Sequence, residues 1–440
     1  MGFSGGYTLP MYLMCVFLAA LCGFINYVND KTIISAGVLF NLYWGINVLL
    51  GSLGLFEVPT ATDRVYLIIL IGILFFNIGT LIPRKVAIRW IASKADYNIN
   101  FLLLRFIFIV IFIYLWIFDI AVIGIIRSGI EFGKIRYYYL GNIFKNFWGG
   151  YEVAYFLRLC LINPLLFTYI TVVFSYICVE NEIKWKMFIG AIMLTVMEYF
   201  AFGDRLIIFF WISCAMVSYG YIKIKIQSNE KTRNRLRRVM VLAVVAIPAV
   251  VLIRGGNFTT VLRSTYTYFV GSLPFLDYRL NDFGDLTYGF ASFQGIIRPI
   301  AAVFKLFGIE FHSFELADEF LNTNQNTVLS MGSYGGTANT FNYFINCFGF
   351  FLKDGGYIGV AIFSFLWGLF SMSIYNRYVN EKGNLLVTAL YIMVVFSIMI
   401  GMMDFAMVEA TFACCIYYIP FVIRQREIRD ESITRISVKV

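Results

Sequence analysis

The chain has 440 residues, of which 60% are hydrophobic, 19% aromatic and only 14% charged, and its mean hydropathy is +0.77. Soluble chains carry about a quarter charged residues. This composition therefore excludes an ordinary soluble domain and indicates a polytopic membrane protein. The net charge of +9 is explained by the bias that keeps Lys and Arg on the cytoplasmic side, so nucleic acid is not an expected partner.

Apolar segments long enough to cross a bilayer follow one another along most of the chain. About eleven are expected, at residues 7–28, 33–55, 65–83, 101–127, 153–178, 185–203, 206–224, 237–253, 356–376, 384–403 and 406–423. The first lacks a basic leader region and is long enough to span, so it is not expected to be a cleavable signal peptide. No internal repeat is visible, which disfavours a transporter built from duplicated halves. The predicted fold class is an all-α polytopic integral membrane protein.

The segment 255–355 is the only long interruption of this pattern. It is dense in aromatic residues, glycine and proline, which a disordered tether would lack. Apolar periodicity in IIRPIAAVFKLFGI and FELADEFLN predicts two helices within it, so the loop should be partly helical and packed on the bundle. The predicted organisation is transmembrane helices 1–8 over 1–254, the large loop over 255–355, helices 9–11 over 356–423, and a tail over 424–440.

The basic residues set the expected orientation. They are concentrated in the join at 223–238 and in the tail after Ile423, and both should be cytoplasmic. Eleven alternating spans accommodate both segments on one side. The large loop is then extracytoplasmic, the C-terminus is cytoplasmic, and the expected location is a bacterial inner membrane.

Cysteine and histidine usage gives no sign of a metal site or a disulfide framework. Seven of the eight cysteines lie in or at the end of apolar spans, and His312 is the only histidine. No D-x-D motif is present, so the usual acidic metal site for a sugar nucleotide is missing. No metal and no cofactor are expected.

Cations predicted to lie at the extracytoplasmic face, against the usual bias, suggest an anionic ligand. Arg205 opens the seventh span, Arg254 closes the eighth, and Arg263 follows shortly after. A planar guanidinium at the membrane surface suits bidentate capture of phosphate oxygens, as in a lipid diphosphate. The alternative for each is an interfacial anchor.

Two further basic residues, Arg136 and Arg298, are also candidates for substrate binding. Arg136 lies in the aromatic segment 128–150, which is typical of an amphipathic element at lipid headgroups or of a simple aromatic belt. For the general base that a sugar hydroxyl would need, the candidates are Asp354, which stands at the predicted depth of Arg205, His312, or another carboxylate of the large loop. Surface carboxylates are more often merely solvated, and a single histidine among aromatics is more often structural.

Three local patterns resemble one family. They are FGDRLIIFF around Arg205, TANTFNYF, which contains Asn339, and KDGGYIGVAIFSFLWG, an Asp-x-Gly-x-x-Gly helix start that contains Asp354. Together with many spans and one large late loop, the chain resembles the O-antigen polymerases, the Wzy-type oligosaccharide repeat-unit polymerases. It departs from the commoner form at Gly355, where an aromatic is often found.

The resemblance implies the all-helical fold of lipid-linked (GT-C-like) glycosyltransferases and undecaprenyl-diphosphate-linked oligosaccharides as substrates. It adds Asn339 as a further candidate substrate-binding residue, and membrane lipid and a chain-length regulator protein as expected partners. Two other functions remain open. An O-antigen ligase would use the same donor and geometry, and a lipid-linked oligosaccharide flippase would line its mid-membrane interior with basic residues. A membrane acyltransferase is the least favoured of the alternative functions, because it would require a buried histidine and the only histidine lies in the loop.

Overall fold

The computed structural model describes residues 10–85, 97–129, 156–180, 182–202, 206–224, 258–334, 337–342, 345–381 and 383–425, together with positions 234 and 238. Most of these residues are helical. Within the described ranges, six helical segments are long and apolar enough to cross a membrane. They are α1 (Met11–Asp30), α3 (Asp63–Lys85), α4 (Phe101–Arg127), η4 (Arg158–Ile162) continued by α8 (Asn163–Glu180), α9 (Trp185–Phe202) and α16 (Cys347–Asn380).

Shorter apolar helices occupy other predicted spans. They are α2 (Ala36–Ser52), α10 (Leu206–Ile224), α17 (Leu385–Ile400) and the successive short helices α18 (Ala410–Ala413) and α19 (Cys415–Val422). The prediction of a mainly helical protein with membrane-spanning helices is thus confirmed at that level. The span predicted at 237–253 lies outside the described residues.

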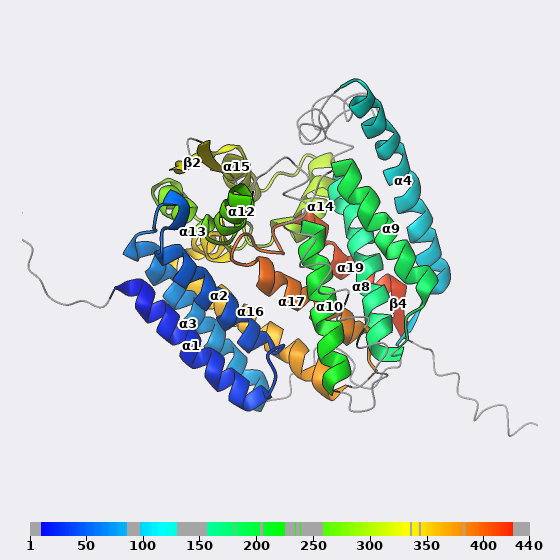
Figure 1. Ribbon diagram of the computed structural model, residues 1–440, viewed down its shortest axis with the longest axis horizontal. Helices are drawn as coiled ribbons and strands as arrows, with labels where there is room; N and C mark the ends of the chain where they lie inside the picture. Colours follow the sequence, from blue (N-terminus) through cyan, green and yellow to red (C-terminus); the bar gives the residue numbers. More distant parts are fainter. Residues whose placement is uncertain are drawn as a thin grey trace, which may run out of the picture.

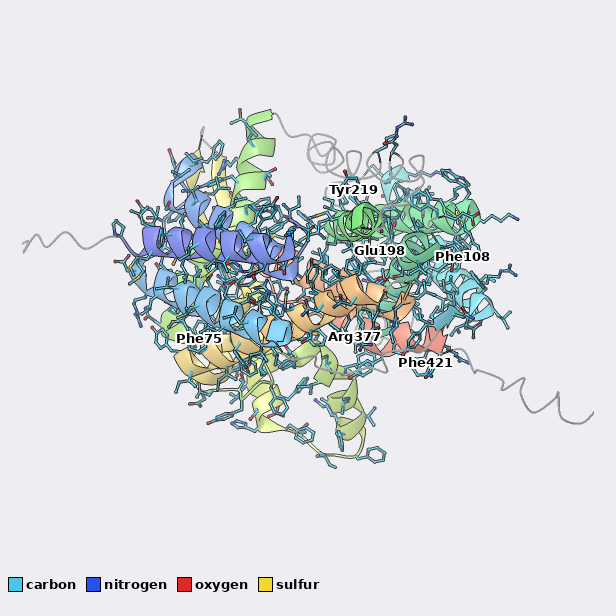
Figure 2. The ribbon with its side chains drawn as sticks, turned by 90° about the horizontal axis from the view of Figure 1, so that it is seen from below. Phe75, Phe108, Glu198, Tyr219, Arg377 and Phe421 are labelled. Atoms are coloured by element: carbon cyan, nitrogen blue, oxygen red, sulfur yellow. The ribbon has the colours of Figure 1, made fainter. Side chains whose placement is uncertain are left out.

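The helices form two groups with α17 between them (Figure 1). The first group contains α1, α2, α3 and α16, and the second contains α4, α8, α9, α10 and α19. Helix α17 contacts α2 and α16 on one side and α8 and α10 on the other. Figure 2, seen from below, shows Phe75 in the first group, and Phe108 and Glu198 in the second.

Helices α3 and α16 approach closely because small residues lie at their crossing. A Cβ atom on Gly79 would come 2.1 Å from the backbone oxygen of Phe365, and one on Gly368 would come 2.0 Å from that of Phe76. Only glycine fits at either position. Small residues let helix backbones pack tightly in a bilayer, where lipid is as apolar as the side chains themselves.

The first group also contains a buried polar network. Asn77 Oδ1 accepts hydrogen bonds from the amides of Asn26 (2.9 Å) and Asn41 (2.8 Å), and Arg84 donates to Asn26 (2.6 Å) and Asp30 (2.8 Å). Interhelical amide bonds of this kind specify which helices pair inside a membrane bundle.

The large loop forms a layer at one end of the two groups (Figure 1). It contains the helices α12 (Phe258–Val270), α13 (Ser272–Arg279), α14 (Gln294–Leu306) and α15 (His312–Asn326), and the strands β2 (Val328–Tyr334) and β3 (Thr337–Asn342). Helices α14 and α15 cover the two stretches predicted to be helical. Pro299, expected near a helix start, lies inside α14.

The mainly helical fold also contains two small antiparallel sheets. Strand β2 pairs with β3, and β1 (Tyr97–Ile99) pairs with β4 (Ile423–Gln425). The second pairing brings the segment before α4 and the segment after α19 to the same side of the bundle. The predicted tail at 424–440 therefore starts inside β4, and residues 426–440 lie outside the described residues.

The boundary predicted between the loop and the ninth span falls inside a helix. Helix α16 begins at Cys347 and has two non-helical residues, Gly355 and Gly356, where it kinks. Gly356 has φ +60°, a left-handed conformation that glycine adopts without strain. The predicted start at residue 356 thus marks the kink, and the helix itself begins nine residues earlier.

Candidate functional site

A cavity of about 1120 Å³ lies between the loop layer and the start of the η4–α8 helix. Helix α14 and helix α15 form two of its walls, and the residues before and within η4 form the third. Its lining residues are Phe156, Leu159, Cys160, Arg298, Ala301, Ala302, Lys305, Ile309, Glu310, Phe311, Phe314, Glu315, Asp318, Glu319, Asn322, Thr323 and Thr327. It joins apolar and aromatic surface to charged, amide and hydroxyl groups, as small-molecule sites commonly do.

The third wall contains an irregular helix. Residues Arg158–Ile162 form a π-helix that leads directly into α8. Single π-helical turns are rare and occur often at functional sites. Leu159 and Cys160 of this turn line the cavity.

Asp318 organises the polar part of the cavity wall. Its Oδ1 accepts hydrogen bonds from Arg298 Nη2 (2.6 Å) and Gln294 Nε2 (2.9 Å), and its Oδ2 accepts one from Asn322 Nδ2 (3.1 Å). The first two bonds join α14 to α15, and the third lies within α15. A charge-assisted pair with two further donors fixes the relative position of the two helices.

Helix α14 is anchored below the cavity on the irregular segment 401–409. Gly295 N donates to Met407 O (3.0 Å), and a Cβ on Gly295 would come 2.7 Å from the backbone of Glu409. Pro299 has no N–H to bond to the Gly295 carbonyl one turn earlier. The Cys414 thiol donates to that oxygen instead, at 3.8 Å.

The structure places one predicted arginine in the cavity. Arg298 lines the wall, already paired with Asp318. Arg263 is buried in α12 and is not among the cavity's lining residues. Arg205, Arg254 and Arg136 lie outside the described residues, so the predicted diphosphate cluster stays a prediction.

Two other sequence candidates lie in the loop layer. His312 is the exposed first residue of α15, beside the lining residues Phe311 and Phe314. Asn339 lies in β3, and its side chain is outside the described part of the structure. His312 is thus placed next to the cavity.

Asp354 is buried at the kink of α16, with 1% of its surface exposed. Its carboxylate accepts hydrogen bonds from Thr287 Oγ1 (2.6 Å), Ala291 N (3.0 Å) and Ser292 N (2.8 Å). Both oxygens are engaged by the loop segment 287–292. The geometry supports a positioning role for Asp354, because a base at this carboxylate would first have to break these bonds.

Lys353 reinforces the same attachment. Its ammonium donates to the backbone oxygens of Phe283 and Asp285, the latter at 2.7 Å. Two adjacent residues of one helix therefore hold two successive parts of the loop. This explains structurally why a Lys-Asp pair precedes the glycines of the KDGGYIG motif.

A second pair of acidic residues, Asp404 and Glu409, lies in the irregular segment between α17 and α18. Both are half-buried, and their side chains hydrogen-bond each other. Removal from water raises the pKa of the Asp404 carboxyl well above its usual range, and the neighbouring Glu409 raises it further. Two interacting carboxyls of this kind hold a proton between them and titrate as a pair.

Sequence analysis gave this pair no role. The available signal was two carboxylates five residues apart in the apolar stretch GMMDFAMVEA, and ionisable residues in such stretches commonly mark functional sites. Glu409 immediately precedes Ala410, which packs with the cavity residue Cys160. Glu409 is therefore one residue away from a contact with the third wall of the cavity.

An ion pair lies on the other side of the π-helical turn. Arg158 Nη2 donates to Glu198 Oε1 at 2.9 Å, and its guanidinium stacks 3.6 Å from the centre of the Phe202 ring. Figure 2 shows Glu198 among the helices of the second group. Arg158 thus fixes η4 against α9.

Comparison with protein-family models, with curated proteins and with solved structures finds no significant match.

Proposed function

We propose that this protein is a membrane glycosyltransferase that polymerises undecaprenyl-diphosphate-linked oligosaccharide repeat units into an envelope polysaccharide. The observation that carries the proposal is the cavity between η4, α14 and α15, which lies where the loop layer packs on the membrane helices. A lipid-linked glycan requires a binding site of this kind. Its lipid stays among the membrane helices, whereas its sugars must enter a polar cavity that the loop covers.

The proposal also specifies a membrane topology that goes beyond what the described helices establish. It has eleven spans, an extracytoplasmic loop layer, a cytoplasmic C-terminus and a GT-C-like arrangement in a bacterial inner membrane. The β1–β4 pairing supports it, because residues 97–99 and 423–425 lie on the same side, as this span count requires. Membrane lipid and a chain-length regulator protein are the further proposed partners.

The transfer step needs no metal in this proposal. A hydroxyl oxygen of the acceptor glycan attacks the anomeric carbon of the donor, and the bond from that carbon to the diphosphate oxygen breaks. The leaving diphosphate keeps the electron pair and is held by Arg205 and Arg254, with Arg263 beside them. The hydroxyl proton passes to a carboxylate or imidazole.

Two positions are proposed for that proton acceptor. Glu409 precedes Ala410, which packs on the cavity-lining Cys160, and its side chain bonds to that of Asp404, so one partner of this pair is proposed to accept the proton. His312 lies beside the opposite wall. Asp354, with both oxygens engaged, is proposed to hold the loop in place.

The function is tested on purified protein supplied with lipid-linked repeat units, by measuring polymer length with and without a chelator. Polymer that forms in both conditions supports the proposal, and no polymer under any condition contradicts it. In a strain without the protein, one repeat unit per lipid anchor indicates a polymerase, whereas long unattached polymer indicates the ligase. Repeat units that stay on the cytoplasmic leaflet indicate the flippase.

The diphosphate clamp is tested with Arg205→Lys and Arg254→Lys. Each change should slow polymerisation by about 30- to 1,000-fold, because a point charge does not reproduce two parallel hydrogen bonds in the transition state. Arg64→Lys, at an exposed position outside the cavity, is the matched control and should keep the wild-type rate. Near wild-type polymer from both variants at normal protein levels would return these arginines to the role of interfacial anchors.

A further inference from the structure

The charges in the cavity wall do not suit an anion. The wall contains four carboxylates and two cations, which are Glu310, Glu315, Asp318, Glu319, Arg298 and Lys305. Arg298 is paired with Asp318 at 2.6 Å, and Lys305 lies 3.8 Å from Glu310. Each cation in the wall therefore already has a carboxylate partner in the same wall. The other two carboxylates, both exposed, add negative charge that no cation among the described lining residues balances.

The remaining lining groups suit sugar hydroxyls. Asn322, Thr323 and Thr327 provide amide and hydroxyl groups. The two hydroxyls donate to backbone oxygens of α15 and present acceptor lone pairs, whereas the Asn322 amide, which donates one N–H to Asp318, retains a second N–H and its oxygen. Phe311 and Phe314 provide flat apolar surfaces of the kind that pack against sugar rings. The volume of about 1120 Å³ is at the upper end of ordinary ligand sites, so several linked sugars have room.

We infer that this cavity binds the glycan of the substrate, that it selects glycans without acidic sugars, and that the diphosphate is bound elsewhere. The inference rests on the proposed function for the identity of the substrate. Its selectivity follows from the wall alone, because a uronate or phosphate inside the cavity would lie among unbalanced carboxylates. Like charges placed together oppose binding strongly in a partly desolvated site.

The test uses two matched probes. The first is the repeat-unit oligosaccharide released from the host's envelope polysaccharide. The second is the same oligosaccharide after its primary hydroxyls have been oxidised to carboxylates. Binding to the full-length protein in detergent, measured by calorimetry, should be at least about tenfold weaker for the oxidised probe, equivalent to about 1.4 kcal/mol.

Two variants locate the selectivity in the cavity. The double variant Glu315→Gln/Glu319→Gln removes the unbalanced charge with little change in shape, and should reduce the difference between the probes to less than about threefold. Glu57→Gln, at an exposed carboxylate outside the cavity, is the matched control and should keep the full difference. Ala302→Trp fills the cavity from a half-buried position on α14 and should weaken both probes at least about tenfold.

Equal binding of the two probes by the wild type, or an unchanged difference in the double variant, would overturn the inference. So would wild-type binding that Ala302→Trp leaves intact, or failure of the unoxidised probe to bind. The polymerisation assay is read separately. Polymer formation without glycan binding in the cavity refutes this inference alone, and selective glycan binding without polymer refutes the proposed function alone.

Discussion

Two aspartates lie at breaks in membrane helices, and their surroundings differ. Asp354, at the kink of α16, has both oxygens engaged by three donors of the loop segment 287–292 and is 1% exposed. Asp404, in the irregular segment after α17, accepts one backbone hydrogen bond from its own neighbour Phe405 (2.6 Å) and bonds to a second carboxyl, Glu409. The first arrangement satisfies one carboxyl group with donors from the loop, and the second joins two carboxyl groups by a hydrogen bond.

This difference suggests separate roles for the two residues. A carboxylate that is saturated by donors contributes to stability, because removing it leaves those donors unsatisfied. Burial and a like-charged neighbour raise the pKa of the Asp404 carboxyl, and perturbed carboxyls of this kind commonly take part in proton transfer. The structure therefore separates the residue that positions the loop from the residues equipped to exchange a proton.

The largest expected effect is that of Asp354→Ala on stability. The change leaves two buried backbone N–H groups without an acceptor and the Thr287 hydroxyl with only the Lys353 carbonyl at 3.4 Å, and should lower the free energy of unfolding by about 3 kcal/mol. The apparent melting temperature in detergent, read by size-exclusion chromatography, measures the effect.

Asp282→Ala is the control for Asp354→Ala. This exposed carboxylate, paired with Arg279 at 3.3 Å, should contribute less than about 1 kcal/mol. Equal melting temperatures for Asp354→Ala and the wild type would remove the proposed role of Asp354.

Asp404→Asn should have the opposite effect to Asp354→Ala: it should slow polymerisation and leave the stability of the fold nearly unchanged. An amide resembles the protonated carboxyl in shape and can still donate to Glu409, so the fold should be retained. Polymerisation should slow by about 100-fold or more, because general-base catalysis commonly contributes that much. Rates and melting temperatures measured on the same preparation separate the two roles. A folded Asp404→Asn protein with wild-type rate would exclude Asp404 as the base and leave Glu409 and His312 as the candidates.

The titration of Asp404 also predicts a pH dependence of stability. Its pKa is raised in the folded protein, so the folded state retains this proton at pH values where the unfolded chain has lost it. The associated stability is fully present below the unfolded pKa of about 3.9 and is lost as the pH rises through the raised folded pKa. Melting temperatures measured between pH 4 and 9 should fall less steeply with pH for Asp404→Asn than for the wild type. A slope that is identical in both proteins would show that another group is responsible.

The sequence predicted the apolar spans well because their length is set by the membrane. The limits of α4 (Phe101–Arg127) and α10 (Leu206–Ile224) match the predicted segments, and α9 ends one residue earlier than predicted. Hydrophobic length is a local property of the chain, so a single sequence reveals it. The two helices predicted inside the loop follow from periodicity in the same way.

The breaks in the helices were not predictable in this way, because contacts distant in sequence determine them. The π-helical turn at Arg158 is held by Glu198, forty residues away, and the split of the last predicted span accommodates Gly295 of α14. Hydropathy also cannot show that two carboxyls in one apolar stretch bond to each other. The candidate site was therefore predicted only in part, and Arg298 is the one sequence candidate that the described structure places in the cavity wall.

The smallest expected effect concerns Thr287, one of the three donors to Asp354. Thr287→Val keeps the size and branching of the side chain and removes a single hydroxyl that bonds to Oδ1 at 2.6 Å. Ala291 N still donates to Oδ1 and Ser292 N to Oδ2, so neither carboxylate oxygen is left without a donor. The expected loss is about 1 kcal/mol, the usual net contribution of one hydrogen bond.

In the double variant Thr287→Val/Asp354→Ala, the two losses should not add, because both changes remove the same bond. Full additivity in the melting temperatures would show that Thr287 and Asp354 act independently, and would contradict the attachment of the loop through this carboxylate.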